Sequence, residues 1–294
     1  MPLESQYFSP FDEIYRAVTE RMRSRSQQLA VDSERNWLNH IIGDFQNERN
    51  VWLVSPSLEA YRLQCERLRF RVVRLVASAF LHVSYDLPRV LADNWPAQGQ
   101  WHAGPSEPRG ERLYFDLRSI FSDVLSTRAR RPQVTGIFAP ILWCVPLKLI
   151  GNLVHWISHL REAAWRHGRT LSNLAPINRA DTEQRMLQAM SIALREVNNL
   201  PWTFTLPEPP NVVAGSLAIV PAFLIAPDNL AVIVLIGSLI LLCAAAYLSW
   251  TALKTDEISR FVDEFGSRVE RYMDLAINHP DTFADMKDSS ERLV

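Results

Sequence analysis

The chain has 294 residues, of which 48% are hydrophobic and 21% charged, enough for one large or two modest folded domains. Its formal net charge of −1 creates no overall field that would attract nucleic acid, so no nucleic-acid partner is expected. Cys65, Cys144 and Cys243 lie far apart without zinc or redox spacing, which indicates reduced thiols. The N-terminal residues include acids and no apolar segment, so no signal peptide is expected.

Only ten glycines interrupt long stretches in which apolar residues recur at helical spacing, and this pattern predicts an all-α fold. A first amphipathic helix is predicted from the stripe formed by Phe11, Ile14, Tyr15, Val18 and Met22. A shorter helix is predicted over 36–47. A long helix is predicted from Ser57 to Leu87, with Pro88 ending or kinking it.

Residues 96–111 are rich in proline and glycine and predict a surface loop, followed by a helix over 112–127. The apolar segment 137–160 is long enough for a membrane span, but two prolines and Lys148 favour a buried or interfacial helix. This helix is expected to end near Pro176. Asp181 and Glu183 predict the start of another helix, which ends near Asn199.

Residues 207–252 are predicted to form a two-helix transmembrane hairpin. The second half, 230–250, contains no charge and is about 31 Å long at 1.5 Å per residue, which suffices to cross the hydrocarbon core. Aromatic residues flank both runs, and Lys254 and Arg260 follow the second, which predicts that both termini face the cytoplasm. The alternative is a buried helical hairpin in a soluble core.

Three parts follow from this pattern: a cytosolic helical bundle over 1–206, the transmembrane hairpin over 207–252, and an amphipathic C-terminal helix and tail over 253–294. The tail helix carries one apolar stripe, which either docks on the bundle or pairs with a second copy of the chain as a homo-oligomer. The stripe consists of Ile258, Phe261, Val262, Phe265, Val269, Tyr272 and Met273.

His82 and Asp86 are the first candidate site, because they stand one helical turn apart in an apolar segment. A carboxylate that holds an imidazole fixes its tautomer and raises its basicity, as a general base or a metal ligand requires. The alternative is a structural role, in which Asp86 ends a helix and forms a hydrogen bond with a buried His82. No Walker, GxGxxG, HExxH, EF-hand or GxSxG motif is present, which argues against the common nucleotide, metalloprotease, calcium and hydrolase sites.

Three segments, AFLHVSYDLPRVLAD, YFDLRSIFSDVL and LREAAWRHG, resemble markers of an uncharacterised bacterial all-helical domain family. The resemblance covers about residues 10–200, and Ser84 and Phe121 stand where the family tends to have asparagine. It implies that His82, Asp86, Asp116 and Arg161 converge, without naming a substrate. The matching positions are His82, Asp86, Leu87, Asp116, Arg161, Glu162, Ala164 and Trp165.

A second candidate is the pair His155 and His159, which share a helix face and could bind a divalent metal such as zinc. A third ligand would have to come from His82, Asp86 or Asp116. Nothing in the local sequence fixes that ligand.

The sequence favours an enzyme that acts on an amphiphilic or lipid-associated substrate at a membrane. In this hypothesis His82 is the general base or ligand, Asp86 orients it, Asp116 is a second carboxylate and Arg161 binds an anion. The alternative is a non-catalytic membrane adaptor or effector whose hairpin and tail assemble in or perturb the lipid bilayer.

Overall fold

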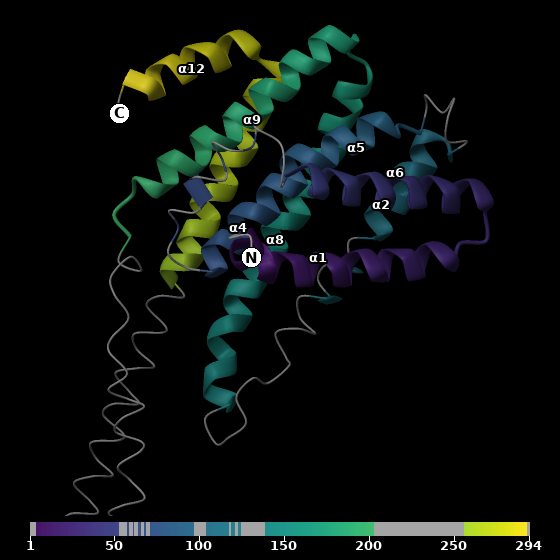
Figure 1. Cartoon of the computed structure of the whole chain (residues 1–294), viewed down its shortest axis with the longest axis horizontal. Helices are drawn as coiled ribbons and strands as arrows, with labels where there is room; N and C mark the ends of the chain where they lie inside the picture. Colours follow the sequence, from purple (N-terminus) through teal and green to yellow (C-terminus); the bar gives the residue numbers. More distant parts are fainter. Residues whose placement is uncertain are drawn as a thin grey trace, which may run out of the picture.

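The computed structural model describes residues 4–52, 71–96, 104–117, 139–202 and 256–292, with single positions between 58 and 68 and between 119 and 124. All regular structure in these residues is helical (Figure 1). The prediction of an all-α bundle is therefore confirmed for this part of the chain.

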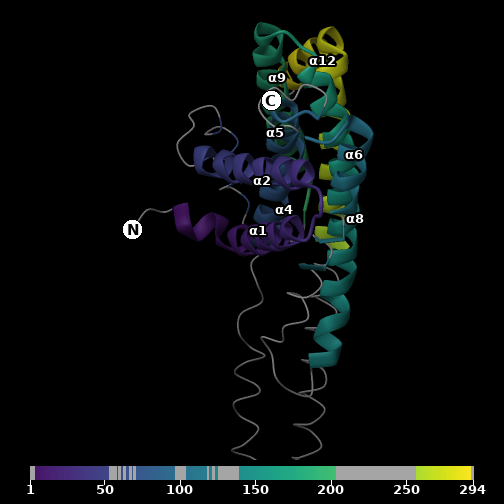
Figure 2. The same ribbon diagram turned by 90° about the vertical axis from the view of Figure 1, so that its right-hand side faces the viewer.

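Two N-terminal helices, α1 (Glu4–Gln27) and α2 (Asp32–Trp52), lie side by side (Figures 1 and 2). Both are longer than the apolar stripes that predict them, because the flanking charged and glutamine residues also favour helix. The acids Asp32 and Glu34 occupy the first turn of α2, where the helix dipole stabilises negative charge.

The next helix passes through Pro88, so of the two predicted alternatives, an end or a kink at Pro88, the end is wrong. It consists of α4 (Arg71–Leu81), the π-helical turn η1 (His82–Asp86) and α5 (Leu87–Asp93). In η1 the N–H of Leu87 donates to the carbonyl of His82, one residue further back than in an α-helix. Pro88 then falls in the first turn of α5, where proline is tolerated.

Two more helices begin earlier in the chain than predicted, and each has a proline in its first turn. Helix α6 (Glu107–Asp116) begins inside the predicted loop, with Pro108 in its first turn. Helix α9 (Pro176–Asn198) begins at Pro176 and not at Asp181. A proline in a first turn loses no hydrogen bond, because the N–H it lacks has no partner inside the helix.

The long helix α8 (Ala139–Ser172) stands upright in Figure 2, with α1 and α2 running across it. The helix over 256–278 contacts both α8 and α9. Asn152 Nδ2 of α8 donates to the carbonyl of Ser259 at 3.1 Å, and the hydroxyl of Tyr272 donates to Glu196 of α9 at 2.6 Å. The chain then continues into α12 (Pro280–Arg292).

One hydrophobic core joins the N-terminal helices to the helix over 256–278. Every member of the predicted tail stripe is buried in that core. The stripe therefore docks within its own chain, as one of the two alternatives predicts. A homo-oligomer formed through this helix stays a prediction.

The transmembrane part of the predicted fold class is wrong for the described residues. No helix among them is both long and apolar enough to cross a membrane. Helix α8 has the length, but Lys148, Arg161 and Glu162 interrupt its apolar residues. The segment predicted as a hairpin, 207–252, lies outside the described residues, and so does the buried-hairpin alternative.

Gly168 allows α8 to approach α5 closely just beyond Pro88. A Cβ added at Gly168 would lie 2.8 Å from the Cβ of Leu91 and 3.2 Å from the carbonyl oxygen of Pro88. Since a backbone oxygen and a buried side chain occupy that space, neither can move aside at low cost.

The substitution Gly168→Ala is expected to lower the free energy of unfolding by about 1–3 kcal/mol through overpacking. Gly43→Ala in α2 is the matched control, because an added Cβ there meets nothing within 4 Å. The control should gain about 0.5–1 kcal/mol from helix propensity. Denaturant unfolding measures both, and a stabilising Gly168→Ala would contradict the close approach.

Burial lowers the pKa of His167 in α8 to about 4, with the charge of Arg166 adding to the effect and Asp274 opposing it. The unfolded chain binds this proton near pH 6.5, so between pH 6.5 and 4 it holds more protons than the folded chain. Stability present above pH 6.5 is therefore lost as the pH falls toward 4, by at most about 3 kcal/mol. In His167→Gln the denaturation midpoint should depend less on pH between pH 6.5 and 4. A pH dependence equal to that of the wild-type chain would refute the assignment.

Candidate functional site

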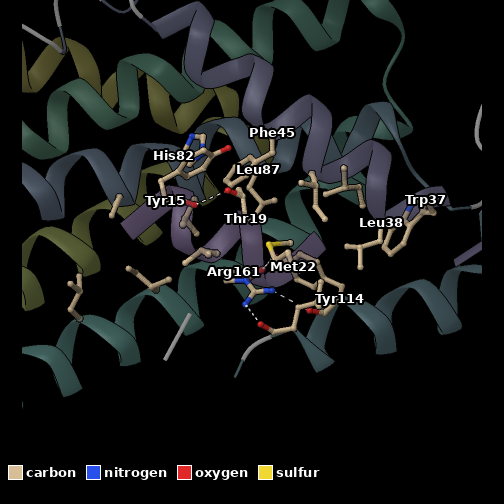
Figure 3. A pocket seen from close by; sticks show the side chains of 18 residues that line it. Tyr15, Thr19, Met22, Trp37, Leu38, Phe45, His82, Leu87, Tyr114 and Arg161 are labelled. Carbon is tan, nitrogen blue, oxygen red and sulfur yellow. Dashed lines mark hydrogen bonds between the residues drawn. The ribbon is translucent and has the colours of Figure 1, made fainter. Parts of the chain in front are cut away.

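A partly open cavity of about 90 Å³ lies between α1, α2, α6, α8 and the turn η1 (Figure 3). Most of its wall is carbon, from residues such as Val18, Leu38, Ile41 and Ile157. The volume equals that of roughly three water molecules in the liquid, but such walls offer water few hydrogen-bond partners. The cavity therefore suits an apolar group better than water. The polar side chains in its wall are Tyr15, Thr19, Trp37, His82, Tyr114 and Arg161.

His82 reaches the cavity wall from η1, and Asp86 holds it from one turn further along. The His82 Nδ1 atom lies 2.7 Å from Asp86 Oδ2, and the two residues are 2% and 0% exposed. The imidazole stacks on the ring of Phe45 at 3.8 Å between centroids, and Tyr15 contacts it edge-on at 4.8 Å. The ring is therefore fixed in position and orientation.

Arg89 joins the buried Asp86 to a network of half-buried charges behind the cavity. Its guanidinium lies 2.7 Å from Glu48 of α2, 3.0 Å from Glu183 of α9 and 3.8 Å from Asp86. Glu183 also accepts from Arg179 at 2.8 Å. The network thus ties α2, α5 and α9 together around η1.

The pKa values in this network follow from burial and close charges. Burial alone would lower the pKa of Arg89, but Tyr85 and the carboxylates of Glu48, Glu183 and Asp86 outweigh it and raise the pKa. Burial raises the pKa of Glu48 against the opposing charge of Arg89, and it raises the pKa of Tyr85 to about 12. Arg89 therefore stays a cation throughout the physiological range.

Arg161 enters the same cavity from α8, next to Tyr114 (Figure 3). Its Nη2 donates to the carbonyl of Tyr114 at 3.1 Å and its Nη1 to that of Leu117 at 3.4 Å. The guanidinium carbon lies 4.9 Å from the centre of the Tyr114 ring. Arg161 thus binds carbonyls at the C-terminal end of α6, where the helix dipole favours a cation.

Asp116 does not lie in this cavity. It is exposed and lines a shallow, open hollow on the outer side of α6 and α8, together with Ser119, His155 and Ser158. Of the four residues expected to converge, His82 and Arg161 share the cavity wall, Asp86 lies behind His82, and Asp116 faces elsewhere.

A metal site at His155 and His159 finds no support in the described residues. Their rings lie 6.5 Å apart and nearly parallel, and His159 Nε2 is 2.8 Å from Glu270 Oε1. No group of three or more His, Cys, Asp or Glu side chains in the described part of the chain could hold a metal ion. The third ligand that the prediction requires is therefore not supplied by His82, Asp86 or Asp116.

Sequence reasoning missed the network and most of the cavity wall. Arg179 and Glu183 stand at the i, i+4 spacing of a helical ion pair, and Arg89 follows Asp86 at i+3, so a search for paired charges could have found them. Phe45 and Tyr114 carry no such signal, because only the packing of distant helices brings them to His82 and Arg161.

Comparisons with protein-family models, with curated protein sequences and with solved structures found no match to this chain. The resemblance of the three segments to a bacterial helical family therefore stays a prediction. What the site can do has to be argued from its own geometry.

Replacing Arg89 with methionine is expected to lower the free energy of unfolding by about 1–3 kcal/mol, because the half-buried Glu48 and Glu183 and the buried Asp86 lose their shared cation. Arg169→Met is the matched control: its side chain is 63% exposed and, among the residues that the structure describes, pairs only with Glu107. That change should cost less than about 1 kcal/mol. Equal losses in urea denaturation would show that the network is no more than a surface ion pair.

Proposed function

We propose that the helical bundle binds a small apolar molecule, or the apolar end of an amphiphilic one, in the cavity between α1, α2, α6, α8 and η1. The observation that carries the proposal is an apolar space of about 90 Å³ at the edge of the hydrophobic core. Ligand sites in helical bundles are commonly built from side chains on facing helices, as here.

The size of the cavity limits the ligand. An engineered apolar cavity of about 150 Å³ holds benzene, so about 90 Å³ admits a group of only a few carbon atoms. A larger ligand would extend beyond the cavity, which is partly open. Val18 and Met22 of α1 are half-buried and form a part of the wall that lies near solvent.

Acid–base chemistry at His82 is the second candidate, and it is favoured by the bond between His82 Nδ1 and Asp86. When Asp86 accepts the Nδ1 proton, Nε2 becomes the basic nitrogen of the ring. His82 would then be the residue that takes a proton from a bound substrate, with Asp86 as its positioning residue. Asp116 has no part in this proposal.

Binding of 1-propanol, whose four non-hydrogen atoms suit a cavity of about 90 Å³, tests the cavity directly. At a concentration of about 100 times its dissociation constant, a ligand specific to the folded state adds about 2.7 kcal/mol and raises the Tm by several degrees. Ala79→Leu places a side chain in the cavity and should abolish the rise, whereas Gly43→Ala, which lies outside the cavity wall, should keep it.

The same titration followed by ¹⁵N NMR should shift the His82 ring signals and leave those of exposed His155 in place. A further comparison needs no ligand: Ala79→Leu should cost less stability than Ala189→Leu, because Ala189 is fully buried and does not line the cavity. A propanol effect that persists in Ala79→Leu would overturn the proposal.

A further inference from the structure

The polar side chains that α1 and α2 bring to the cavity wall donate their hydrogen bonds to backbone carbonyls. The hydroxyl of Thr19 donates to the carbonyls of Tyr15 and Arg16 on its own helix, at 3.0 and 2.9 Å. The indole N–H of Trp37 donates to the carbonyl of Asn94 at 2.7 Å. The donors of Thr19 and Trp37 are therefore already used within the protein.

The polar side chains that α6 and α8 bring to the wall bind each other's helix. The hydroxyl of Tyr114 donates to the carbonyl of Arg161 at 2.8 Å. In return, the guanidinium of Arg161 donates to the carbonyls of Tyr114 and Leu117 and lies over the Tyr114 ring. These contacts direct the charge of Arg161 to the C-terminal end of α6, where the helix dipole favours a cation.

The imidazole of His82 meets aromatic rings where it reaches the wall. Phe45 stacks on the imidazole and Tyr15 contacts it edge-on, while its Nδ1 atom lies 2.7 Å from Asp86. Nearly all of the surface that the described residues present to the cavity is accordingly carbon.

We propose that the ligand of this cavity is a small uncharged molecule without hydrogen-bonding groups, namely a hydrocarbon of about three or four carbon atoms. The proposal rests on the cavity being a binding site, and it names the chemical class that the site takes. A hydroxyl or a charged group that leaves water for such a wall loses its hydrogen bonds without replacement, whereas a hydrocarbon has none to lose.

This assignment separates the two candidate functions. General-base chemistry at His82 requires a substrate that gives up a proton to the imidazole. A hydrocarbon offers no such proton near neutral pH. The apolar wall therefore favours ligand binding over acid–base chemistry in this cavity.

Three probes with the same number of carbon atoms test the assignment: cyclopropane, 1-propanol and propanoate, with dissociation constants measured by NMR titration at neutral pH. The wild-type chain should bind cyclopropane about 10-fold to 100-fold more tightly than 1-propanol, because a buried hydroxyl without a partner lowers affinity by roughly that factor. Propanoate should bind most weakly. Ala79→Leu should abolish the binding of cyclopropane, and Gly43→Ala, outside the cavity wall, should leave it unchanged.

Equal affinity for cyclopropane and 1-propanol, or a preference for 1-propanol or propanoate, would overturn the hydrocarbon assignment and leave the cavity proposal standing. Binding of none of the three probes would overturn both, and so would cyclopropane binding that persists in Ala79→Leu. If that variant does not fold, the wild-type affinities and the ring signals of His82 decide. Cyclopropane binding that leaves those signals in place would also overturn both.

Discussion

The π-helical turn at His82–Asp86 is the constraint on which the rest of the structure depends. A π-turn adds one residue to the helix, so every side chain after it is rotated by about 100° relative to an uninterrupted α-helix. With this rotation, Arg89 meets Glu48 and Glu183, and Leu91 meets Gly168. Without it, α5 would present a different face to α2, α8 and α9.

The turn also separates two kinds of environment. On one side His82 packs against Phe45 and Tyr15 and faces an apolar cavity, and on the other Asp86 faces the cation of Arg89. Burying charges is costly, so a network of this kind is better explained as fixing a unique arrangement of helices than as adding stability. Its effect here is to hold the imidazole in one position at the cavity wall.

The sequence predicts those features that depend on local periodicity. The stripe from Phe11 to Met22 and the stripe from Ile258 to Met273 both lie on helices, because an apolar face must be buried whatever it packs against. Pro88 misleads because the rule that proline breaks a helix assumes an α-helical register, which the π-turn changes. Pro108 and Pro176 lie in the first turns of α6 and α9. If proline is taken to indicate a loop, the predicted start of each helix falls too late in the chain.

The candidate site could be predicted only in part. His82 and Asp86 stand one turn apart, so their contact follows from helix geometry alone. Arg161 reaches the same cavity through the packing of α8, which no local pattern reveals. Asp116 fails to join them because it lies on the outward face of α6, whereas its neighbours Leu113 and Tyr114 point inward. The face of a short helix that turns inward depends on the whole bundle.

The ion pairs of the network hold some of the helices around the cavity and leave out α1. The ion pairs among Glu48, Arg89, Glu183 and Arg179 bind α2, α5 and α9 to one another, and α1 takes no part in them. Helix α1 is held instead by apolar packing and by contacts near its C-terminal end, such as the bond between Ser26 and Asn39 at 2.7 Å. An outward movement of α1 therefore breaks no pair of this network. Because α1 also supplies Tyr15, Val18, Thr19 and Met22 to the cavity wall, it is a part of the wall that the ion pairs of the network do not fix.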